Sequence, residues 1–143
     1  MKRTLFTLAI AALSAIGSAG VFAQTTDTGG LLRDKAGKTL YLFDKDVAGE
    51  SRCFDNCAAV WPPFMAADGA QAAGKLTLVA RKGGGQQWAW GGMPLYYFAG
   101  DAKVGDTSGD GSGGVWHVIK AAGGDKPGEK RAATGNAADP YKY

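Results

Sequence analysis

The sequence is poor in the residues on which most catalytic and metal sites depend. It holds one histidine, His117, and two cysteines, Cys53 and Cys57, among 143 residues. No Ser-His-Asp set can be picked out, because a single histidine and scattered aspartates occur in most sequences. A glycine-rich phosphate loop ending in lysine is also missing. We therefore expect a protein that is not an enzyme.

Long apolar runs are scarce as well. The one run of note, from Leu5 to Ile16, is shorter than the roughly 20 residues that span a bilayer. Two basic residues precede it and Val21-Phe22-Ala23 follows it, which is the layout of a bacterial secretory signal peptide cleaved after Ala23. We expect residues 1–23 to be removed and the mature chain to be soluble, periplasmic or secreted, with no transmembrane segment.

Charge and cysteine usage fit export. Loss of Lys2 and Arg3 lowers the formal net charge from +3 to +1, which gives no electrostatic basis for binding nucleic acid. An oxidising compartment normally bonds a pair such as Cys53 and Cys57. Their spacing lacks both the histidine of a haem attachment site and the two-residue gap of a thioredoxin-like pair. We predict a structural disulfide.

Both ends of the mature chain are polar. Residues 24–30 are Gly-rich and are expected to form a flexible leader. Residues 121–143 carry little beyond Ala, Gly and charge, and cannot bury enough apolar surface to offset the entropy of ordering, so we expect a disordered tail. The folded domain is placed at 31–120.

This domain contains an internal repeat. The stretches 37–46 and 92–101 have the same skeleton, and Val-Trp follows each at the same distance, while the segments between are unlike. We place the copies at about 31–75 and 76–120. The seven identities, at a shift of 55 positions, are Gly37/Gly92, Leu40/Leu95, Tyr41/Tyr96, Phe43/Phe98, Asp46/Asp101, Val60/Val115 and Trp61/Trp116.

Strand signals dominate the domain. Residues 38–43 are rich in β-formers and apolar on both faces, with Leu40 and Leu42 on one and Tyr41 and Phe43 on the other. Only Asn56 to Val60 looks helical, ending before Pro62 and Pro63. The sequence predicts a mainly β fold, in which two pseudo-symmetric β repeats form one small domain with one short helix near the cysteine pair. Further strands are expected at 95–98 and 115–120, and a hairpin at 76–81 with 86–90.

The repeated phrase carries a Y-x4-D motif in each copy, at Tyr41–Asp46 and Tyr96–Asp101. The first copy adds C-x3-C-A-x-x-W-P-P, beginning at Cys53. In these motifs the sequence resembles a family of bacterial secreted repeat lipoproteins, over about residues 31–120. The resemblance implies secretion and tandem repeats, and no established reaction. The chain departs from that pattern in lacking a lipobox cysteine, so we expect no lipid anchor there.

The Y-x4-D motif does not bring its own two residues together. Five residues along a strand cover about 16 Å and leave the side chains on opposite faces. An aspartate at a strand end commonly binds nearby backbone N–H groups and fixes a turn, which is the interpretation we favour. The alternative is contact between the copies, with Tyr41 near Asp101 and Tyr96 near Asp46.

The four tryptophans divide into two pairs. Trp61 and Trp116 are expected to be buried core anchors, one per copy, with Tyr41 and Tyr96 buried beside them. Trp88 and Trp90 share one face of a strand. That pair is equally compatible with core packing and with an exposed aromatic platform for a ligand.

Two functions from different classes remain open. The first is a non-enzymatic periplasmic binding or envelope-interaction module, with an unknown ligand or envelope protein as partner and no cofactor. The second is a metal- or redox-associated protein. His117, Met93 and Met65 offer ligands that copper accepts, but no spacing singles them out.

Overall fold

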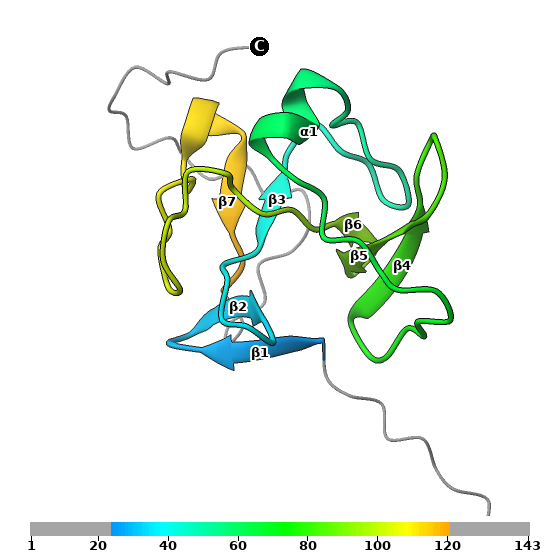
Figure 1. The fold of residues 1–143 in the computed structure, drawn as a ribbon, viewed down its shortest axis with the longest axis horizontal. Helices are drawn as coiled ribbons and strands as arrows, with labels where there is room; N and C mark the ends of the chain where they lie inside the picture. Colours follow the sequence, from blue (N-terminus) through cyan, green and yellow to red (C-terminus); the bar gives the residue numbers. More distant parts are fainter. Residues whose placement is uncertain (1–23, 121–143) are drawn as a thin grey trace, which may run out of the picture.

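The computed structural model describes residues 24–120, and our expectations for residues 1–23 and 121–143 lie outside that range. The mainly β fold is confirmed. The strands form three small antiparallel sheets, ordered β1-β2, β3-β7 and β4-β5-β6 (Figure 1). In chain order the elements are β1 (Thr25–Thr28), β2 (Leu31–Asp34), β3 (Tyr41–Phe43), α1 (Asn56–Val60), β4 (Leu76–Ala80), β5 (Gln86–Trp90), β6 (Met93–Pro94), the 3-10 turn η1 (Ser112–Gly114) and β7 (Trp116–Val118).

The expected helix and hairpin are both present. Helix α1 has the bounds read from the sequence and closes with a bond from Trp61 N–H to the Cys57 carbonyl, 2.7 Å long. Strands β4 and β5 pair around three consecutive glycines with positive φ, Gly83 to Gly85. Glycine adopts that conformation without steric cost, which allows the tight reversal. No helix in the described part of the chain is long or apolar enough to cross a membrane.

The prediction of a flexible leader at residues 24–30 is wrong. Residues 25–28 form β1, which pairs with β2 from Thr25↔Asp34 to Thr28↔Leu31. Gly29 and Gly30 both have positive φ, the combination that a type I′ hairpin turn requires. The Arg33 Nε donates to the Thr28 carbonyl at 3.2 Å, which links β2 to the end of β1.

The two copies of the repeat exchange strands. Strand β3 of the first copy pairs with β7 of the second, with Phe43 opposite Trp116. The equivalent pairing is made by the other two segments, since Tyr96 of the second copy forms a β-bridge with Pro63 of the first. Equivalent backbone bonds flank both pairings, from Asp44 N to Val115 O (2.8 Å) and from Ala99 N to Val60 O (2.9 Å). Each copy therefore completes its partner rather than itself.

The relation between the copies is an approximate two-fold axis. Tyr41 N donates to Tyr96 O at 2.9 Å, and Tyr96 N donates to Tyr41 O at 3.1 Å. Such reciprocal contacts are those of an isologous interface. The axis passes between these two residues, which confirms two pseudo-symmetric β repeats.

Alternation along the strands builds two hydrophobic clusters. Tyr41 and Phe43 face the first, which we call the aromatic core; Leu40 faces the second core. The aromatic core also contains Cys53, Cys57, Trp61, Tyr96, Phe98, Trp116 and Val118. The second core contains Leu32, Leu40, Phe64, Leu76, Trp88, Leu95 and Ile119.

Candidate functional site

The Tyr and Asp residues of the repeated motif meet across the two copies. The Tyr41 hydroxyl donates to Asp101 Oδ2 at 2.6 Å, and the Tyr96 hydroxyl donates to Asp46 Oδ2 at 2.7 Å. Both tyrosines are fully buried. The structure thus has the cross-copy arrangement that the sequence offered as the alternative.

The favoured turn-fixing role is also present, on the second oxygen of each carboxylate. Asp46 Oδ1 accepts from Arg52 N at 2.6 Å, and Asp101 Oδ1 accepts from Ser108 N at 2.9 Å. Each aspartate therefore closes its own loop and anchors a tyrosine of the other copy. The motif residues are engaged within the protein.

One of the two pairs lies in a wider polar network. The Tyr96 hydroxyl also lies 2.7 Å from Ser51 Oγ, which accepts from Arg81 Nη1 at 3.0 Å. Burial raises the pKa of Asp46 to about 6, while the hydrogen bonds from Arg52 N–H and Tyr96 lower it in part. Burial likewise raises the pKa of Tyr41 and Tyr96, so both phenols are neutral at pH 7.

The first copy closes the aromatic core with its cysteines, and the second with its Gly/Ser loop. Cys53 and Cys57 form the predicted disulfide, with Cα atoms 5.2 Å apart. On the other side, a Cβ on Gly109 would lie 2.6 Å from Trp61 Cη2, so only glycine allows the loop to approach the indole. Trp61 and Trp116 are both buried, as core anchors would be.

The other candidate residues lie outside any common site. Trp88 is only 3% exposed, so Trp88 and Trp90 do not form an exposed platform. On β7, His117 Nε2 lies 3.0 Å from the Oδ2 atom of Asp44, which follows β3. Met93 pairs with Trp90 in the β4-β5-β6 sheet. Within residues 24–120 no cluster of three or more His, Cys, Asp or Glu side chains is arranged to hold a metal.

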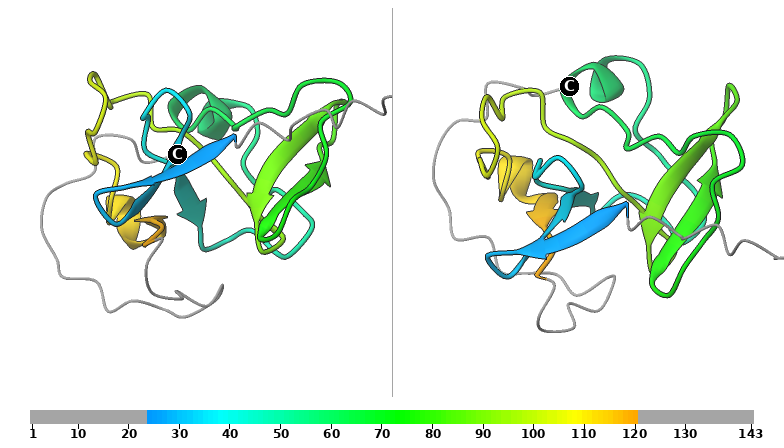
Figure 2. Two further views of the ribbon diagram at one scale, coloured as in Figure 1. Left: turned by 90° about the horizontal axis from the view of Figure 1, so that it is seen from below. Right: turned by 60° about the horizontal axis from the view of Figure 1, so that its bottom comes forward.

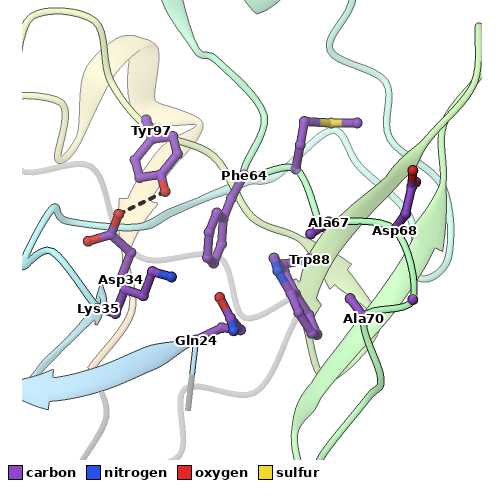
Figure 3. A pocket seen from close by; sticks show the side chains of 11 residues that line it. Gln24, Asp34, Lys35, Phe64, Ala67, Asp68, Ala70, Trp88 and Tyr97 are labelled. Carbon is purple, nitrogen blue, oxygen red and sulfur yellow. Dashed lines mark hydrogen bonds between the residues drawn. The ribbon is translucent and has the colours of Figure 1, made fainter. Parts of the chain in front are cut away.

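A pocket of about 420 Å³ opens beside the second core. Its wall is aromatic, formed by Phe64, Trp88 and Tyr97, and its volume lies in the range of small-molecule sites. The Phe64 ring centroid lies 5.4 Å from that of Tyr97 and 6.3 Å from that of Trp88. Figure 3 shows these rings around the hollow, with Gln24 below them. The β1–β2 and β4–β5 hairpins face each other in Figure 2. Residues of both hairpins and of the segment 64–70 line the pocket.

The charged groups at the rim have different roles. The Asp34 carboxylate is committed to the fold, accepting from Ala36 N, Lys38 N and the Tyr97 hydroxyl at 2.8–2.9 Å. The Lys35 side chain is exposed, makes no ion pair within residues 24–120, and points toward the space before Phe64 (Figure 3). Asp68 points away from the rings. The pocket therefore offers one cation to a ligand.

The aromatic wall of the pocket has no aromatic counterpart at the positions related to it by the two-fold axis. Phe64 and Tyr97 correspond to Ile119 and Leu42 at the 55-residue shift. Trp88 corresponds to Leu32, since Trp88 N donates to Phe64 O as Leu32 N donates to Ile119 O, both at 2.8 Å. Three aromatic rings on the pocket side thus replace three aliphatic side chains on the related side.

Sequence reasoning missed this pocket. Of its wall, only Trp88 was named as a candidate. The signal was nevertheless present, because Leu42 and Tyr97 occupy the same place between identical neighbours, a tyrosine before and a phenylalanine after. Gln24 and Lys35 carried no such signal. Gln24 precedes β1, which was not expected to be a strand, and Lys35 follows β2, which reaches the pocket only through tertiary packing.

Comparisons with known proteins add the family. A family model described as a secreted repeat of unknown function matches residues 23–65 and 77–120, one match for each copy. Neither the curated proteins nor the solved structures provide a match to this chain.

Proposed function

Because the chain belongs to the family of secreted repeats of unknown function, we propose that it is a non-enzymatic secreted binding module and that the aromatic-walled pocket is its ligand site. The motif residues that the two copies share join the copies to each other, through the Tyr41–Asp101 and Tyr96–Asp46 hydrogen bonds. The binding function therefore rests on residues in which the copies differ.

The replacement of Leu32, Leu42 and Ile119 by Trp88, Tyr97 and Phe64 is the observation that carries this proposal. Packing alone is satisfied by aliphatic side chains on the related side of the same core. Tyr97 is half-buried, whereas Phe64 and Trp88 are buried. The flat group of the ligand therefore stacks mainly on Tyr97, at little entropic cost. The ligand we infer is a small molecule with a flat apolar group and an anionic group that pairs with Lys35.

Three related probes test the ligand chemistry. Indole, indole-3-acetate and tryptamine share one ring system and are neutral, anionic and cationic respectively. We expect saturation-transfer NMR to show the tightest binding for indole-3-acetate, weaker binding for indole and the weakest for tryptamine. Equal binding of all three, or binding of none, would contradict the proposal.

Matched variants locate the site. Ala67 is an exposed residue of the pocket, so Ala67→Leu fills it with little cost in stability, and we expect it to abolish binding of all probes. Lys35→Gln should remove the preference for the anion and leave indole binding unchanged. Lys45→Gln, an exposed lysine that does not line the pocket, is the control.

We also propose that the chain is exported to the periplasm or the medium. The signal-peptide layout at residues 1–23 supports a periplasmic or secreted chain that begins at Gln24. N-terminal sequencing of protein from the periplasmic fraction tests this, and recovery only from detergent-solubilised membrane would contradict it.

A further inference from the structure

Four aromatic rings form a continuous chain through the aromatic core. The ring centroids of Tyr41 and Trp61 are 5.3 Å apart, those of Trp61 and Trp116 3.8 Å, and those of Trp116 and Tyr96 5.2 Å. A tyrosine ends the chain on each side of the two-fold axis. Each terminal hydroxyl already donates a hydrogen bond to a carboxylate, at 2.6 and 2.7 Å. Ligand binding in the pocket uses none of these groups.

We propose that this chain is a one-electron relay that accepts oxidising equivalents from a one-electron oxidant outside the protein. The oxidant gains one electron and Tyr41 loses one, while the phenolic proton moves along its hydrogen bond to Asp101 Oδ2. The product is a neutral tyrosyl radical. When the radical moves on through the indole pair, Tyr96 gives its proton to Asp46 and Tyr41 recovers its own from Asp101.

The surroundings of the rings fit this role. Burial raises the pKa of both phenols, so each is neutral at pH 7 and loses an electron readily only if an acceptor takes its proton. The two carboxylates are such acceptors. Trp61 Nε1, in contrast, is buried with no hydrogen-bond partner among the described residues. An oxidised Trp61 therefore keeps its proton and stays reactive enough to oxidise a tyrosine.

The two ends of the relay differ in exposure. The Tyr41–Asp101 bond is partly buried, and the neighbouring Ser108–Asp101 bond is exposed. The Tyr96–Asp46 bond is buried. Both tyrosine rings are buried, so an external oxidant touches neither ring. It can approach the half-buried Asp101 at the Tyr41 end, whereas Asp46 at the Tyr96 end is buried.

Flash photolysis with ruthenium tris(bipyridine) tests the relay in the full chain. Chloropentaamminecobalt(III) takes an electron irreversibly from the excited dye, and the Ru(III) complex so formed is the one-electron oxidant. In the wild type we expect the tryptophanyl absorption to decay as a tyrosyl signal rises. The double variant Tyr41→Phe with Tyr96→Phe keeps both rings but loses both hydroxyls. It should lose most of the tyrosyl signal and prolong the tryptophanyl radical. Near-UV circular dichroism verifies that the variant is folded.

Tyr97→Phe is the matched control. The Tyr97 hydroxyl also donates to a carboxylate, that of Asp34 at 2.9 Å, but its ring contacts Phe64 and packs against the second core. We expect no change in either signal. Equal tyrosyl yields in the control and in the double variant would place the radical elsewhere and overturn the relay.

Asp101→Asn is a second test that removes no aromatic ring. It tests the relay even if the double variant does not fold. An amide cannot take the phenolic proton, so tyrosyl formation should slow and the tryptophanyl radical should persist. An unchanged rate would overturn the relay.

Discussion

The indole rings of Trp61 and Trp116 lie face to face across the pseudo-two-fold axis, with centroids 3.8 Å apart and planes 3° from parallel. Each indole is flanked by a phenylalanine of the other copy, Phe98 beside Trp61 at 4.4 Å and Phe43 beside Trp116 at 4.1 Å. The stack therefore joins the two copies, and each indole ring covers the other.

Removal of either indole should unfold much of the domain. Trp61→Ala and Trp116→Ala empty large core sites, and each should lower the free energy of unfolding by about 3–5 kcal/mol, most of the stability of a small domain. The double variant should cost less than the sum, because the two rings share a contact. Urea melts measure both effects. Trp90→Ala, at a half-buried site, is the control, and equal costs at all three positions would contradict this view of the core.

The strand exchange predicts that neither copy folds alone. A chain cut between residues 72 and 73 leaves β3 in one fragment and its partner β7 in the other. We expect fragments 24–72 and 73–120 to lack near-UV circular dichroism separately and to recover it when mixed in equal amounts. A first fragment that folds unaided would show that the copies are independent.

The disulfide predicts a moderate loss of stability on its removal. Closing so short a loop constrains the unfolded chain by about 2 kcal/mol on the chain-entropy model. Cys53→Ala with Cys57→Ala should show a loss of at least this size in urea melts, because the removal of two buried sulfur atoms from the aromatic core also costs packing. Intact mass with and without reductant verifies the bond in protein from the periplasm. Free thiols there would contradict it.

Much of the local structure could be predicted from the sequence. The bounds of α1 followed from Pro62 and Pro63, and the two faces of β3 followed from alternation. Both signals are local, because a proline acts on the residue before it and side chains in a strand alternate.

The pairing between copies could not be predicted in the same way. An internal repeat shows that two segments are alike, but it does not say whether Tyr41 meets the aspartate of its own copy or that of the other. Strand geometry excluded a direct Tyr41–Asp46 contact and left the choice open. The pocket was missed for a related reason, since Lys35 and Trp88 are brought together only by tertiary packing of two hairpins.

The buried carboxylate of Asp46 predicts how stability changes with pH. Burial raises the pKa of Asp46 from 3.8 to about 6 in the folded protein. Between these values the folded state holds a proton that the unfolded chain has released. The contribution of Asp46 to stability is therefore greatest below pH 4 and is lost as the pH rises through 6. Since one pKa unit corresponds to about 1.4 kcal/mol, the loss is about 3 kcal/mol at most.

Asp46→Asn isolates this contribution. The amide oxygen can still accept from Arg52 N–H, but the side chain no longer titrates. We expect the wild type to lose stability relative to Asp46→Asn between pH 4 and pH 7, measured as the difference between urea melts at each pH so that other titrating groups cancel. A difference that does not change with pH would mean that burial leaves the carboxylate unperturbed. A wild type that instead gains stability over this range would mean that Arg52 and Arg81 outweigh desolvation and favour the charged form.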